Sequence, residues 1–216
     1  MIKRGKGAKN RTVVAVVLDK SSSMESVARE TRSGFNEYIT TLENDKNADY
    51  SVHVTLFDTE VQKVHSDVRP QDVEELDDVN YRPGGMTALY DACMMTISKT
   101  QQFLKEGEKV LFVIMTDGEE NASKESTRDD FNKKVKELEK AGNWSFVFLG
   151  ANQDAWATAQ RLGFSHGNVA TYTASGTGVR SAFAAVANNT TAFAMNASTT
   201  TDSFFSDKDK DNLAKG

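Results

Sequence analysis

Residues 12–23, TVVAVVLDKSSS, contain the stretch that decides the fold of this chain. Its apolar and β-branched beginning shows no polar alternation, which is typical of a strand buried on both faces of a parallel sheet. Asp19, Ser21 and Ser23 then follow at alternate positions and carry the hard oxygen atoms that Mg²⁺ prefers. The stretch therefore predicts an interior strand that delivers metal ligands at its carboxyl end.

Two later segments carry the same kind of side chain where a strand ends or a helix begins. Thr87 closes the sequence Gly84-Gly85-Met86-Thr87, which opens a helical stretch. Asp117 lies in Thr116-Asp117-Gly118, directly after the apolar run at 110–115. Taken with the first stretch, they predict one divalent-cation site whose ligands are Asp19, Ser21, Ser23, Thr87 and Asp117.

Each of these motifs also has an ordinary structural explanation. Ser22 or Ser23 can cap a helix that begins near residue 26, and Gly-Gly and Asp-Gly pairs are common in turns. The three motifs together, in this order, favour the metal site. Two carboxylates would neutralise a bound Mg²⁺, and three hydroxyls would leave it able to attract a further acceptor, so a carboxylate from outside would complete the site.

Hydrophobic periodicity predicts that strands and helices alternate along the chain. Strands are predicted at 12–18, 50–57, 60–65, 110–115, 144–149 and 169–172, and helices at 26–42, 71–76, 88–104, about 131–141, 155–162 and 179–196. Only Asp58-Thr59 separates the second and third strands, so these two are predicted to pair antiparallel, with the third at the sheet edge.

The predicted fold class is α/β, a three-layer Rossmann-like, doubly wound and mostly parallel sheet with one antiparallel edge strand. The domain is predicted to span 12–196, after a flexible basic arm at 1–11 and before a flexible acidic and polar tail at 197–216. An acidic, flexible tail can present a carboxylate to the metal of the same or a neighbouring molecule, so self-association is one predicted outcome.

The bulk composition excludes several classes of function. The chain has 26 Lys and Arg against 31 Asp and Glu, a net charge of −5, which argues against sequence-independent nucleic-acid binding. No apolar run approaches the roughly 18 residues of a membrane span. Cys93 is the single cysteine, so no intramolecular disulfide can form, and a reducing, cytoplasmic location is predicted.

The three motifs resemble those of the von Willebrand factor A domain family. Its metal-ion-dependent adhesion site uses an Asp-x-Ser-x-Ser loop, a Thr and an Asp, which match Asp19-Lys20-Ser21-Ser22-Ser23, Thr87 and Asp117. The resemblance covers about residues 12–172 and implies a Rossmann-like sheet and a Mg²⁺ or Mn²⁺ ion that an acidic residue of a partner protein completes. One departure is Ser22, where the family commonly has Gly. The single cysteine and small size resemble stand-alone intracellular members from bacteria or phages.

We therefore predict a metal-dependent protein-binding module that is not an enzyme. A Mg²⁺-dependent hydrolase or phosphotransferase is one alternative, with Glu25, Glu119 or Glu120 as the base. The three histidines, however, lie outside the motifs, and no phosphate-binding Gly-x-x-x-x-Gly-Lys-Ser/Thr loop occurs. A second alternative is nucleic-acid binding through the basic arm at 1–11.

Overall fold

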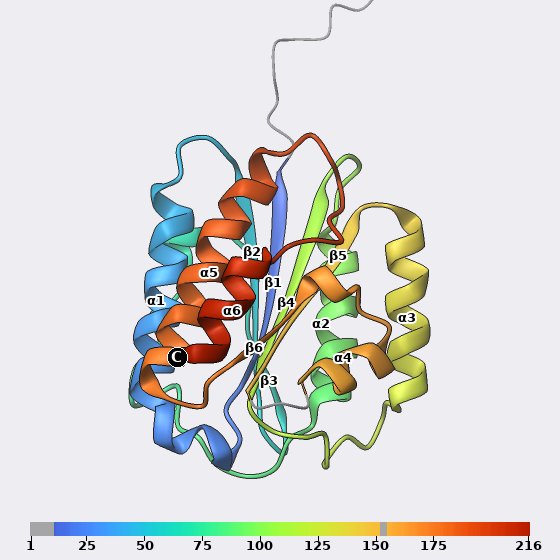
Figure 1. The fold of residues 1–216 in the computed structure, drawn as a ribbon. Helices are drawn as coiled ribbons and strands as arrows, with labels where there is room; N and C mark the ends of the chain where they lie inside the picture. Colours follow the sequence, from blue (N-terminus) through green and yellow to red (C-terminus); the bar gives the residue numbers. More distant parts are fainter. Residues whose placement is uncertain (1–10, 152–154) are drawn as a thin grey trace, which may run out of the picture.

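A six-stranded sheet flanked by helices on both faces forms the molecule, in a computed structural model that describes residues 11–151 and 155–216 (Figure 1). The strands are β1 (Thr12–Asp19), β2 (Tyr50–Phe57), β3 (Val61–Val68), β4 (Lys109–Thr116), β5 (Trp144–Ala151) and β6 (Val169–Tyr172). The α-helices are α1 (Ala28–Asn44), α2 (Leu89–Phe103), α3 (Arg128–Ala141), α4 (Ala155–Leu162), α5 (Gly176–Met195) and α6 (Asp207–Lys215). Short 3₁₀ segments are η1 (Ser22–Val27), η2 (Pro70–Asp72) and η3 (His166–Asn168).

The strand order is β3-β2-β1-β4-β5-β6, and β3 alone among these strands runs antiparallel. All eight residues of β1 are buried, and β1 pairs with β2 on one side and β4 on the other. The predicted fold class, with its antiparallel edge strand, is confirmed. The chain moves from β1 toward β3 and later returns to β4, so the strand order reverses between β1 and β4, where open α/β sheets bind ligands.

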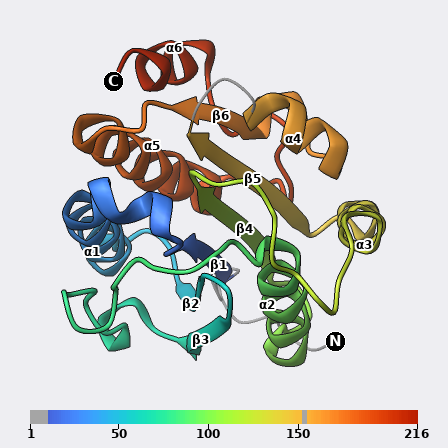
Figure 2. The ribbon, with the colours of Figure 1, turned by 90° about the horizontal axis from the view of Figure 1, so that it is seen from below.

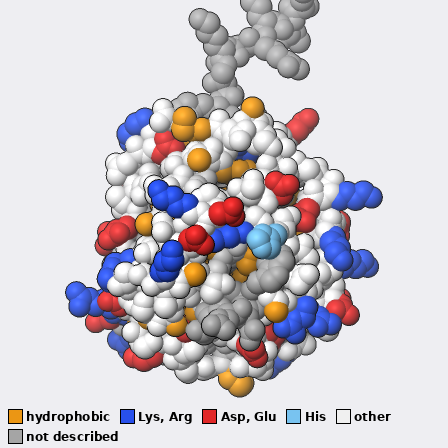
Figure 3. All heavy atoms as spheres, viewed as in Figure 1, with side chains coloured by type: hydrophobic (Ala, Val, Ile, Leu, Met, Phe, Trp, Pro, Cys, Tyr) orange, Lys and Arg blue, Asp and Glu red, His pale blue; other side chains and the backbone are white. Residues whose placement is uncertain are grey.

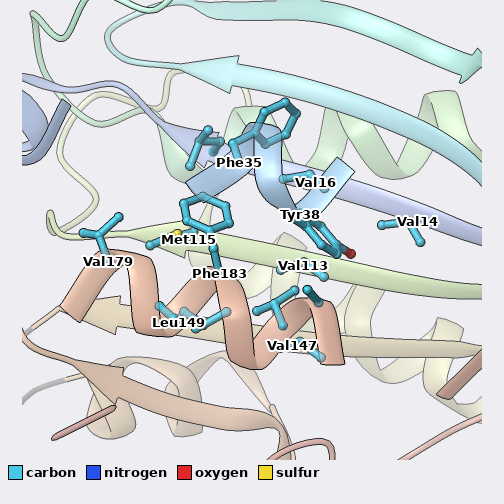
Figure 4. Close-up of a cluster of buried hydrophobic side chains, with 14 of the residues drawn as sticks. Val14, Val16, Phe35, Tyr38, Val113, Met115, Val147, Leu149, Val179 and Phe183 are labelled. Carbon is cyan, nitrogen blue, oxygen red and sulfur yellow. The ribbon is translucent and has the colours of Figure 1, made fainter. Parts of the chain in front are cut away.

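Two apolar cores cover the two faces of the sheet. On one face, Phe35 and Tyr38 of α1 and Phe183 of α5 pack over strand residues such as Val14 and Val113 (Figure 4). On the other face, residues of α2, α3 and α4 pack against β1, β4 and β5. The view onto the carboxyl edge shows α1 and α5 on one side of the sheet and α2 and α3 on the other (Figure 2).

Two predicted helices differ from the structure. The first was expected to begin near residue 26, but η1 takes the chain through a 3₁₀ turn and α1 begins at Ala28. The helix predicted at 71–76 is only the 3₁₀ turn η2. Beyond it, the amide of Glu74 donates to His65 Nε2 and that of Leu76 to Asn36 Oδ1, so these donors bond side chains and do not continue a helix.

The segment after α5 differs from the solvated tail predicted at 197–216. Phe204, Phe205 and Leu213 are buried in the core that also contains α1 and α5, and α6 begins with a capping box between Ser206 and Asp209. The backbone amide of residue 173 donates to the carbonyl of Leu213, which ties α6 to the end of β6. Burial of Phe204 and Phe205 and the Ser206-x-x-Asp209 cap order this segment, although its many charged residues are typical of a solvated tail.

Arg11, the last residue of the predicted basic arm, is also fixed to the domain. Arg11 forms ion pairs with Asp67 of β3 and Glu108 before β4, and its side chain is largely buried. The rest of the arm, residues 1–10, lies outside the described residues.

On the face that carries α5 and α6, acidic and basic side chains are interspersed (Figure 3). None of the helices in the described ranges combines the length and apolar character that a membrane crossing requires.

The lowered pKa of His53 in β2 is expected to make folding stability depend on pH. The His53 side chain is buried, Nδ1 has no hydrogen-bond partner among residues 11–151 and 155–216, and burial lowers its pKa to about 4 despite nearby Asp67. The unfolded chain therefore binds the proton more tightly, and stability is lost as pH falls from about 6.5 to 4, by up to about 3 kcal/mol. We expect His53→Leu to remove this loss in urea unfolding at pH 7 and pH 4.5. Equal losses in both proteins would contradict the assignment.

Candidate metal centre

Asp19 is the last residue of β1 and lies at the centre of the site. Its side chain is fully buried. Oδ1 accepts the backbone N–H of Ser21 at 2.7 Å, and Oδ2 accepts the hydroxyl of Thr116 at 2.5 Å. These two hydrogen bonds hold both carboxylate oxygens in place. Each oxygen has two lone pairs, so each can still accept a further bond.

Ser21, Ser23 and Asp117 form a connected chain of oxygen atoms beside this carboxylate. The hydroxyls of Ser21 and Ser23 lie 3.1 Å apart, and Ser23 Oγ donates to Asp117 Oδ1 at 2.5 Å. The Asp-x-Ser-x-Ser loop after β1 and the turn after β4 therefore meet, as expected for the carboxyl ends of two adjacent parallel strands.

Thr87 approaches the same point from the loop before α2. Its backbone N–H donates to Asn121 Oδ1 at 2.8 Å, and its carbonyl accepts the amide of Asn121 at 3.0 Å. The residue is only 3% exposed, and its hydroxyl forms no hydrogen bond within the described part of the chain. The lone pairs of this oxygen are therefore unused, and the atom is available to a ligand.

Gly118 shows that these oxygens face one small space. A Cβ atom on Gly118 would lie 2.9 Å from Thr87 Oγ1, 3.5 Å from Ser23 Oγ and 3.6 Å from Asp19 Oδ2. Oxygens from three separate segments thus converge on a point that the missing side chain keeps open. The donor set fits a hard divalent cation, because it contains only carboxylates and hydroxyls.

The helix-cap explanation of the serines is wrong. Ser21 is the residue before η1 but makes no side-chain cap, and Val27 precedes α1, also without a side-chain cap. The hydroxyl of Ser22, which stands where the family commonly has Gly, donates to the carbonyl of Gly85 at 2.9 Å. Ser22 therefore ties the first loop to the loop that carries Thr87.

Further contacts fix these two loops. Lys20 forms an ion pair with Asp58, whose carbonyl accepts the amide of Ala88 at 2.8 Å. The amide of Gly84 donates to the carbonyl of Lys20 at 2.8 Å. The buried hydroxyl of Tyr81 donates to the carbonyl of Asp19 at 2.6 Å. The site is thus held by the backbone on several sides.

The electrostatics of the site favour a cation. Burial raises the pKa of Asp19 to about 6; the hydrogen bonds from Thr116 and Ser21 oppose the shift, and nearby Asp117 adds to it. Burial also raises the pKa of Asp117. Among the described residues, no Lys or Arg forms an ion pair with either carboxylate, and no group of three or more His, Cys, Asp or Glu side chains gathers here. The buried carboxylate of Asp19 and the half-buried one of Asp117, together with the hydroxyls, supply the hard oxygen ligands that Mg²⁺ takes.

The structure brings all five predicted residues together, and their role as metal ligands stays a prediction. Sequence reasoning missed the support given by Thr116, Gly118 and Asn121. Thr116 and Gly118 were interpreted only as parts of a turn. The alignment of β1 and β4, with Leu18 opposite Met115, could have placed the Thr116 hydroxyl beside Asp19.

The match to a family model fits this geometry. Residues 14–185 match the model of the von Willebrand factor type A domain, and the chain belongs to this family. No curated protein matches the chain in a sequence search.

Solved structures show the same fold. Proximal thread matrix protein 1 from the mussel byssus has a TM-score of 0.64 and 18% identity over 82% of this chain and 45% of that chain. A structure of that protein with a zinc-occupied MIDAS motif has a TM-score of 0.62 and 15% identity, over 81% of this chain and 46% of that one. The manganese-loaded TRAP protein of Plasmodium vivax has a TM-score of 0.57 and 14% identity, over 76% and 69%. The chain thus spans less than half the length of the byssus protein.

Gly118→Ala tests the space between the oxygens. We expect it to abolish Mg²⁺ binding, because the methyl group would lie 2.9 Å from Thr87 Oγ1. Gly118 has no positive φ, so the change in unfolding free energy should stay within about 1 kcal/mol. Gly84→Ala is the matched control, since its Cβ would meet nothing within 4 Å. Calorimetry with Mg²⁺ measures both, and undiminished binding by Gly118→Ala would refute this location.

Asp19→Asn tests the burial of the carboxylate. Since its pKa is raised from 3.8 to about 6, the ionised form destabilises the metal-free fold fully above pH 6 and not at all below about pH 4. We expect Asp19→Asn to stabilise the metal-free protein at pH 8 by about 1–2 kcal/mol, with a smaller gain at pH 5. Urea unfolding after metal removal measures this gain, and a less stable variant at pH 8 would count against it.

Proposed function

We propose that this domain carries an intact metal-ion-dependent adhesion site and binds a partner protein through Mg²⁺ held there. The ion would be held by Asp19, Ser21, Ser23, Thr87 and Asp117, and an Asp or Glu of the partner would complete its coordination. Mn²⁺ could take the same position. The observation that carries the proposal is the Thr87 hydroxyl, which makes no hydrogen bond within the described residues and faces the same point as Ser23 Oγ and Asp19 Oδ2.

The charge of the site supports a carboxylate as the partner's ligand. Asp19 and Asp117 together match the charge of one divalent cation, and the hydroxyl ligands are neutral. The nearest basic side chain along the chain, Lys20, is already paired with Asp58. A bound ion would therefore keep enough local attraction to hold an incoming anion, as hard cations with incomplete protein ligand sets do.

We place this interaction in a reducing, cytoplasmic setting of a bacterium or phage. Cys93 is fully buried in α2, and burial raises the pKa of its thiol well above the usual value, so the group stays protonated and inert. The partner of the metal can also be a second copy of this chain. In that case an acidic side chain other than Asp209 would be used, because Asp209 is engaged in the cap of α6.

The proposal assigns no catalytic step to the domain. Of the alternative bases, Glu120 has both oxygens occupied, since they accept N–H groups of Tyr90, Ala122 and Ser123 and the Ser123 hydroxyl. His53 is buried in β2, and His65 Nε2 accepts the amide of Glu74. Phosphoester turnover that disappears in Asp19→Ala would overturn this part of the proposal.

Thr87→Val tests the proposal with a nearly isosteric change. It removes the hydroxyl and keeps the buried volume, so we expect Mg²⁺ and Mn²⁺ affinity in calorimetry to fall at least about tenfold, or about 1.4 kcal/mol. The metal-free fold should remain as stable as wild type. Thr100→Val is the matched control, because Thr100 is buried in α2 and its hydroxyl donates to the carbonyl of Thr96.

The partner itself is tested by affinity purification with and without a chelator. We expect one set of proteins to be retained by wild type and Thr100→Val with Mg²⁺, and lost with the chelator or with Thr87→Val. Retention that is indifferent to both would show that recognition does not use the metal.

A further inference from the structure

A pocket separate from the metal centre is connected to it by the loop after β4. Its volume is about 160 Å³, and we call it the arginine pocket, lined by Tyr90, Glu119, Glu120, Arg128, Thr158, Arg161 and Leu162. We propose that the arginine pocket binds a second oxyanion carried by the same partner protein, a carboxylate or a phosphoryl group. This inference rests on the proposed function and specifies the partner as one with two acidic groups at a fixed separation.

The loop after β4 connects the two sites. Asn121 Oδ1 accepts the amide of Thr87, and Glu120 Oε2 accepts the amide of Tyr90 at 3.0 Å. Tyr90 is also the third residue after the predicted metal ligand Thr87. Arg128 begins α3 and Arg161 lies near the end of α4, and these helices lie on the same side of the sheet as α2 (Figure 2).

The pocket offers hydrogen-bond donors that the protein leaves unused. Arg161 forms no ion pair among the described residues, and only its Nε donates, to the carbonyl of Ala157 at 3.0 Å. Within the described ranges, the one ion pair of Arg128 is with the exposed Asp129, at 3.4 Å. The Tyr90 hydroxyl makes no hydrogen bond in the described part of the chain. A guanidinium with free Nη atoms is suited to bidentate binding of a carboxylate or phosphate.

Both arginine charges act on the Tyr90 hydroxyl. Burial and Glu120 raise the pKa of Tyr90, whereas Arg128 and Arg161 lower it. Arg128, Arg161 and Tyr90 also line the same pocket, so the two guanidinium groups and the phenol can act on one bound group together. The phenol O–H can add a neutral hydrogen bond to the two charged donors.

The pocket has few free acceptors. The carboxylate of Glu120 already accepts from the amides of Tyr90, Ala122 and Ser123 and from the Ser123 hydroxyl. Glu119 is exposed and is the remaining acidic side chain in the lining. Among the described lining residues, free donors thus outnumber free acceptors, which favours an anion over a Lys or Arg of the partner. The volume suits the end of one side chain, since a cavity of about 150 Å³ accommodates a group the size of benzene.

The first experiment tests the pocket without metal. Amide signals of ¹⁵N-labelled protein are followed during titration with sodium acetate, and separately with inorganic phosphate, at constant ionic strength. We expect saturable shifts at Tyr90, Thr158 and Arg161 for at least one anion, and the tighter anion identifies a carboxylate or a phosphoryl group. Affinity should fall at least about fivefold in Arg161→Gln. Arg180→Gln is the matched control, because Arg180 is half exposed on α5 and lies 3.5 Å from Glu30.

The second experiment tests the link to the metal. Synthetic peptides with one Asp, or with two Asp separated by one to five Gly or Ser residues, are titrated into wild type with Mg²⁺. At least one spacing should bind about tenfold more tightly than the single-Asp peptide, because the second contact is intramolecular. If the metal-free titration selects phosphate, phosphoserine replaces the second Asp. Arg161→Gln should remove the advantage, and Arg180→Gln should keep it.

The outcomes separate the two proposals. Absence of saturable anion shifts, or identical shifts in Arg161→Gln, would refute the arginine pocket while leaving Mg²⁺ binding intact. Anion binding in the pocket without any Mg²⁺ binding would refute the proposed function and the link between the sites. Equal affinity of one-Asp and two-acid peptides at every spacing would refute the link alone.

Discussion

The rest of the site depends on one constraint, the burial of the Asp19 carboxylate at the end of the central strand. Every residue of β1 is buried, and the strand is enclosed between β2 and β4. An ionised carboxylate in that position loses solvation, and no Lys or Arg in the described ranges forms an ion pair with it. Such a group is retained where something else compensates the charge. Its hydrogen bonds from Ser21 and Thr116 orient it for that purpose.

Topology explains why the compensating atoms come from three separate segments. The strand order reverses between β1 and β4, so the loops after these strands leave in different directions and open a gap at the carboxyl edge. The loop before α2 enters this gap and brings the Thr87 hydroxyl to the oxygens of Asp19 and Ser23. The backbone N–H of Thr87 in this loop also donates to Asn121 in the segment after β4. The neighbouring Glu120 of that segment lines the arginine pocket. The metal centre and the pocket are therefore two parts of one edge.

Sequence patterns predicted the sheet well because burial determines it. The strand at 50–57 and the strand at 169–172 were predicted with the observed bounds, since β-branched and aromatic runs have few alternatives. The five candidate ligands were found by motif spacing. The supporting contacts were not predicted, because Gly118 and Asn121 contact the segment that carries Thr87. Such contacts between segments far apart in the sequence leave no local sequence pattern. Helix α6 was not predicted because its sequence is highly charged. Its position is fixed by the burial of Phe204 and Phe205, directly before it.

Crystals grown with Mn²⁺ would test the central claim most directly, through an anomalous difference map. The account predicts a single strong peak at the point where Asp19 Oδ2, Ser23 Oγ and Thr87 Oγ1 converge, with metal–oxygen distances near those of a hexacoordinate hard cation, roughly 2.0–2.3 Å. A map without a peak there, or with its strongest peak held by other residues, would contradict it.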